Sequence, residues 1–102
     1  MANVYTTNPI VLDTFNAAID VCAGCGFATG TPLFVHSIEW QTPTAVGDTA
    51  AITDAVSGTP VFTETCTVAN QSVIKYFGGR PVRNLNIAIS GVTHGSIIIM
   101  LV

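Results

Sequence analysis

Short runs of β-branched and aromatic residues alternate with glycine and proline about every ten residues along this 102-residue chain. β-Branched and aromatic side chains favour extended backbone, whereas glycine and proline favour turns. Short strands separated by regularly spaced turns are typical of β-sandwiches and small barrels. We therefore expect residues 1–102 to form one all-β domain, a jelly-roll-like β-sandwich of about seven short antiparallel strands.

The expected strands are segments in which apolar and polar residues alternate or in which apolar residues run together. They lie at residues 9–14, 32–40, 49–56, 61–68, 72–77, 81–90 and 96–102. Residues 15–21 are ambiguous, because Phe15, Ala18 and Ile19 also fit one or two turns of helix. A glycine-rich loop is expected at 22–30.

Short connections predict two hairpins, one between the third and fourth strands and one across Gly91–Gly95. In the second strand, strict alternation would place Phe34, His36, Ile38 and Trp40 on one face, so we expect His36 in the core or in an interface.

The last six residues of the chain, 97–102, are all apolar. A strand of this kind on an exposed sheet edge would promote aggregation. We therefore expect it at the centre of a sheet or beneath another subunit. If one of its faces packs on the core of the domain, the other face needs a further cover.

Charged residues make up 9% of the chain and hydrophobic residues 49%, whereas an average soluble domain has about 25% charged residues. The cores of protein–protein interfaces are depleted in charge in the same way, so we expect a homo-oligomer.

Lys75, Arg80 and Arg83 are the only basic residues, and the net charge is −3. Phosphate neutralisation needs clustered basic residues, so no direct contact with nucleic acid or with an anionic membrane is expected. Neither a transmembrane span nor a signal peptide is expected either.

The one motif with chemical promise is Cys22-Ala23-Gly24-Cys25. A redox motif of this spacing begins a helix in a βαβ unit, and the strand pattern lacks such a unit. A zinc site would need two more ligands, from Cys66, His36 and His94. We favour the three cysteines as small buried hydrophobic residues, although the sequence alone leaves metal binding by them open.

The remaining polar residues fit structural roles. Asp48 follows Gly47 and is expected in a turn, and His94 is expected to be exposed in a turn beside Gly95. The sequence contains no nucleophile elbow and no phosphate-binding loop. We therefore expect no catalytic residue, no cofactor site and no metal site, and we do not expect an enzyme.

The order of strands and turns provides a family resemblance. The segments that carry it are residues 8–14, 35–40, 47–54, 58–62, 81–87, 90–91 and 96–99. Together they resemble the small virion structural proteins of tailed bacteriophages, which are about a hundred residues long. Residues 22–30 depart from the pattern, because a loop rich in glycine and cysteine is not expected there.

This resemblance implies a capsid decoration, or cement, protein that binds and stabilises the lattice of the major capsid protein. It also implies a homotrimer on local three-fold axes, no catalytic residues, and a place in the virion after assembly in the host cytoplasm. Two alternatives remain: a tail, baseplate or fibre-adaptor component of the virion, and a small β-sandwich that binds a ligand or a glycan.

Overall fold

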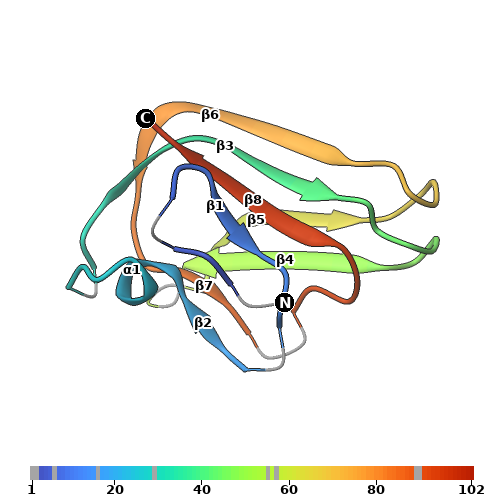
Figure 1. Ribbon diagram of the computed structural model, residues 1–102, viewed down its shortest axis with the longest axis horizontal. Coiled ribbons are helices and arrows are strands. Elements are labelled where there is room, and N and C mark those ends of the chain that lie inside the picture. Colours follow the sequence, from blue (N-terminus) through green and yellow to red (C-terminus); the bar gives the residue numbers. More distant parts are fainter. Residues whose placement is uncertain are drawn as a thin grey trace.

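Two antiparallel four-stranded sheets pack face to face in the computed structural model (Figure 1). It describes residues 3–5, 7–15, 17–28, 30–54, 56, 58–88 and 91–102. The first sheet contains, in spatial order, β1 (Ile10–Leu12), β8 (Ser96–Leu101), β3 (Leu33–Gln41) and β6 (Val73–Val82). The second sheet contains β2 (Ile19–Asp20), β7 (Leu85–Ile87), β4 (Thr49–Asp54) and β5 (Pro60–Thr65). The expected all-β sandwich is confirmed.

The strands pair as in one long hairpin that contains the whole chain and is folded into two sheets. β1 pairs with β8 and β3 with β6 in the first sheet, while β2 pairs with β7 and β4 with β5 in the second. Early strands therefore pair with late strands in reverse order, and successive pairs alternate between the sheets. An eight-stranded double sheet of this kind is a jelly roll.

The core lies between the sheets and is built from alternate residues of each strand. Trp40 and Phe62 are its largest side chains, and both are buried. The indole Nε1–H of Trp40 donates to the carbonyl oxygen of His94 at 2.8 Å, so its one polar atom is satisfied. Within the described residues, no helix is long and apolar enough to cross a membrane.

The expected alternation in residues 34–40 is wrong at its start, because β3 contains a bulge between Val35 and Ser37. A bulge adds a residue to one strand and so reverses the faces on either side of it. Val35 is buried as a result, whereas Phe34 and His36 are exposed. His36 is therefore not in the core, and its expected alternative position in an interface stays a prediction.

The strands expected at 72–77 and 81–90 also need correction. β6 continues through Gly78 and Gly79, both at positive φ, and ends at Val82. Glycine adopts this conformation without steric cost, and Pro81 is tolerated because β6 is an edge strand. The next strand, β7, is only Leu85–Ile87, and residues 89 and 90 of the expected strand lie outside the described residues.

Of the two expected hairpins, one is present in the structure and the other is not. The hairpin between β4 and β5 is confirmed, with residues 55 and 57 of this region outside the described part. The hairpin across Gly91–Gly95 is wrong, because β7 and β8 lie in different sheets. The ambiguous segment 15–21 contains the strand β2 at Ile19–Asp20. The short helix, α1 (Val21–Gly24), begins at the last residue of that segment and occupies the start of the expected loop. Residues 16 and 29 lie outside the described residues.

The C-terminal strand lies where the sequence predicts. β8 is central in the first sheet, between β1 and β3 (Figure 1). Ile97 and Ile99 are fully buried in the core, whereas Ile98 and Met100 alternate with them on the outward side.

Candidate functional site

The outward face of the first sheet is lined mainly by apolar side chains. Residues paired directly across antiparallel strands point to the same side of a sheet. One row crosses all four strands as Val11, Ile98, Glu39 and Ile74. A second row contains Met100, Ser37 and Tyr76, and Phe34 lies farther along β3. We call the apolar members the apolar face: Val11, Phe34, Ile74, Tyr76, Ile98 and Met100.

Several of these side chains are strongly exposed. Tyr76 is 68% exposed, Phe34 54%, Ile74 43% and Met100 37%. They lie on β3, β6 and β8, the three adjoining strands of the first sheet. Single exposed apolar residues are ordinary, but a continuous patch of them indicates an interaction surface.

The outward face of the second sheet provides an internal contrast. Its paired rows are Thr49 with Thr65 and Ala51 with Thr63. Threonine hydroxyls hydrate well, so this face needs no cover. The sandwich therefore has one apolar outer face and one polar outer face.

Charge is sparse on the apolar face. Among the described residues of the rows above, Glu39 is the one carboxylate, and it lies between Ile98 and Ile74. Its Oε1 accepts a hydrogen bond from Nε2 of Gln41 at 3.0 Å. The exposed ring of His36 meets Tyr76 edge-on, with ring centroids 5.9 Å apart.

A hollow of about 570 Å³ lies along the edge strand β6, lined by Lys75, Tyr76, Phe77, Gly78 and Arg80. Lys75 Nζ lies 5.2 Å from the centroid of the Phe77 ring and donates to the carbonyl oxygen of Val61 at 3.2 Å. Two of the three basic residues of the chain therefore line this edge.

The polar pair that sequence reasoning missed is Asp48 with His94. Both turn positions are as expected, and His94 is exposed, but Asp48 is largely buried. Nδ1 of His94 donates to Oδ1 of Asp48 at 2.9 Å, across 46 positions of sequence. This hydrogen bond, followed by one from the backbone N–H of Ala45, holds the pKa of the Asp48 carboxyl below its usual value. No local pattern in the sequence signals this contact.

An Asp–His pair resembles part of a hydrolytic triad, in which the imidazole must also reach a nucleophile. In the described part of the chain, no hydroxyl or thiol is hydrogen-bonded to the His94 ring. The neighbouring hydroxyl of Thr93 instead bonds the backbone N–H and carbonyl of Thr49, at 2.8 and 3.2 Å. The hydrogen bond between Asp48 and His94 therefore links the loop before β4 to the loop before β8.

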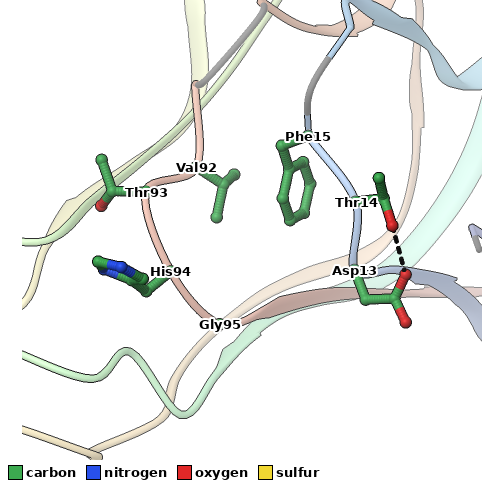
Figure 2. Close-up of a pocket in the computed structure, with 7 residues that line it drawn as sticks. All are labelled: Asp13, Thr14, Phe15, Val92, Thr93, His94 and Gly95. Atoms are coloured by element: carbon green, nitrogen blue, oxygen red, sulfur yellow. Dashed lines mark hydrogen bonds between the residues drawn. The ribbon is translucent and has the colours of Figure 1, made fainter. Parts of the chain in front are cut away.

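Beside this pair, the segments 13–15 and 92–95 border an open hollow of about 670 Å³. In Figure 2, Phe15 and Val92 project into the space between the segments, whereas the hydrogen-bonded side chains of Asp13 and Thr14 point away from it. His94 also turns its ring away from Phe15. The side chains that project into this hollow in Figure 2 are therefore apolar.

The three cysteines are free thiols, and Cys22 and Cys66 are buried as expected, while Cys25 is partly exposed. The thiol of Cys22 donates to the carbonyl oxygen of Ala28 at 3.1 Å, and that of Cys66 to Val68 at 3.2 Å. Burial, with a smaller contribution from Cys22, raises the pKa of Cys25, which is opposite to the shift of a reactive redox thiol.

The residues that a zinc site would need in addition, from Cys66, His36 and His94, do not form a ligand cluster with this motif in the described part of the chain. Within the residues that the structure describes, no three His, Cys, Asp or Glu side chains are placed to hold a metal ion together. That the protein binds no metal stays a prediction.

Comparisons with protein-family models, with curated proteins and with solved structures find no match to this chain. The function is therefore inferred from the geometry of the apolar face.

Proposed function

We propose that this protein is a non-catalytic structural subunit of a larger assembly, which docks through the apolar face of its first sheet. The observation that carries the proposal is the contrast between the two outer faces. Phe34, Ile74 and Tyr76 are exposed on one of them, while the other is rich in threonine. Apolar area gains about 25 cal/mol per Å² when it leaves water, so this face favours association.

The assembly we propose is a bacteriophage virion, with the protein as a capsid decoration subunit that stabilises the lattice of the major capsid protein. The resemblance in the order of strands and turns supports this assignment, and the jelly-roll topology is compatible with it, because viral capsid proteins use this fold. Lectin domains use it too, and a fold alone does not define a function. The apolar face is therefore the reason to propose an assembly, and the resemblance is the reason to propose that the assembly is a virion.

A pair of matched substitutions tests the docking face. Ile74→Asp adds a charge to the apolar face, and Thr63→Asp adds the same charge to an exposed strand position of the second sheet. We expect both variants to fold, because neither position is in the core. Ile74→Asp should lose association with itself or with virion particles in sedimentation, while Thr63→Asp should behave like the parent. Equal association of both variants would contradict the proposal.

A further inference from the structure

Acidic and basic groups lie on opposite sides of the first sheet near its β6 edge. Glu39 is on the outward side, paired with Ile74. Lys75 pairs with Ile38 and Arg80 with Val35, and both of those partners are buried in the core. Because paired residues share a side of the sheet, Lys75 and Arg80 extend from the inward side, at the open edge of the sandwich.

Within one molecule, Glu39 extends from one side of the sheet and the two basic residues extend from the other. The side-chain contact between Asp48 and His94 involves none of the three. Lys75 already contacts the Val61 carbonyl and the Phe77 ring. Arg80 is exposed in the same hollow and has the guanidinium geometry that suits a carboxylate.

The charges also distinguish between two ways of covering the apolar face. In a two-fold contact of this face with itself, with the axis through its central row, Glu39 would approach its own copy, and like charges brought together oppose association. In a head-to-tail contact, the face of one copy meets the β6 edge of the next, so that Glu39 meets Arg80. Such a contact repeats around a ring or along a filament.

We infer that the apolar face of one copy receives the β6 edge of a second copy, with Glu39 of the first copy paired with Arg80 of the second. This inference rests on the proposed function, because it names the partner at the same docking surface. A closed ring of three such contacts would be the expected trimer.

Charge reversal tests the pairing in the full-length chain. We expect Glu39→Arg to weaken self-association about tenfold or more in sedimentation equilibrium, because it puts two cations at the contact. Arg80→Glu should have the same effect, because it opposes two carboxylates. The combination Glu39→Arg/Arg80→Glu should recover most of the parent association constant. Arg83→Glu is the matched control, since Arg83 lies outside the hollow and carries the same change of charge. Circular dichroism of each variant checks that it is folded.

Two results would overturn this inference while leaving the proposed function intact. Single reversals without effect, or a double variant weaker than either single variant, would show that Glu39 and Arg80 do not meet. Stronger association of Glu39→Gln than of the parent would indicate the two-fold contact instead. If Ile74→Asp also leaves every association unchanged, the docking face itself is wrong, and the proposed function fails with it.

Discussion

At the scale of single residues, the side chain of Asp48 connects two loops of the chain. Its Oδ2 accepts hydrogen bonds from the backbone N–H groups of Thr44 and Ala45 at 3.0 and 2.9 Å, and its Oδ1 accepts from the His94 ring. The first two bonds close the turn that precedes β4, and the third attaches the loop before β8. A neutral carboxyl group would accept these bonds less well.

The lowered pKa of Asp48 makes stability depend on pH. The folded-state pKa lies below the unfolded-state value of about 3.9, so the carboxylate contributes stability above that value. This contribution is lost as the pH falls through the folded-state pKa. We expect the melting temperature to fall with pH in this acidic range. Asp48→Asn should lower it at neutral pH and flatten this part of the profile.

His94→Gln provides the control for the cause of that shift. Without the imidazole, the largest contribution to the lowered pKa is gone, so the acid loss of stability should be smaller than in the parent and complete at a higher pH. Thermal melts from about pH 6 to about pH 2 measure both variants. Identical pH profiles for parent, Asp48→Asn and His94→Gln would show that this contact does not form in solution.

At the scale of elements, one face of β8 packs in the core and the other lies on the apolar face. Ile99 is fully buried in the core, whereas Ile98 lies on the apolar face in the row with Glu39. Alternation in a strand allows neighbouring residues to serve stability and association separately.

This division gives opposite expectations for two adjacent substitutions. Ile99→Asp buries an unpaired charge in the core, which is strongly destabilising for a domain whose whole stability is about 5–15 kcal/mol. We expect it to abolish folding, seen as loss of the cooperative thermal transition. Ile98→Asp should give a folded protein with a native-like circular dichroism spectrum that no longer associates. If both variants fold and associate as the parent does, β8 has neither role.

The elements also show how far local sequence information extends. The central position of β8 follows from six consecutive apolar residues, and the β4–β5 hairpin from a short turn. The bulge in β3 could not be predicted, because Phe34, His36, Ile38 and Trp40 keep a regular spacing that hides the reversal at Val35. Likewise, the loop at 91–95 has the length of a hairpin but crosses between sheets, with Val92 bridged to Ala50 of β4.

For the candidate site, the sequence predicted an apolar strand whose second face needs a cover. It could not identify the neighbours that complete the apolar face, because Phe34, Ile74 and Ile98 come from three distant segments. The same limit applies to Asp48 and His94, whose contact depends on how the β4 and β8 loops meet in the fold.

At the scale of the whole molecule, the two outer faces of the sandwich differ in polarity. In the assembly that we propose, a jelly roll with one apolar and one threonine-rich face would be oriented with its polar face toward water. The low content of charged residues, 9%, fits a chain whose solubility is needed only until it is covered.

The most direct test of this claim is a cryo-EM map of the assembly that incorporates the chain, resolved to side chains. The account predicts a neighbouring subunit in contact with Tyr76 and Ile98 on the apolar face, and water against Thr49, Thr63 and Thr65 on the second sheet. A map in which the apolar face is open to solvent, while the threonine-rich face makes the contacts, would contradict it.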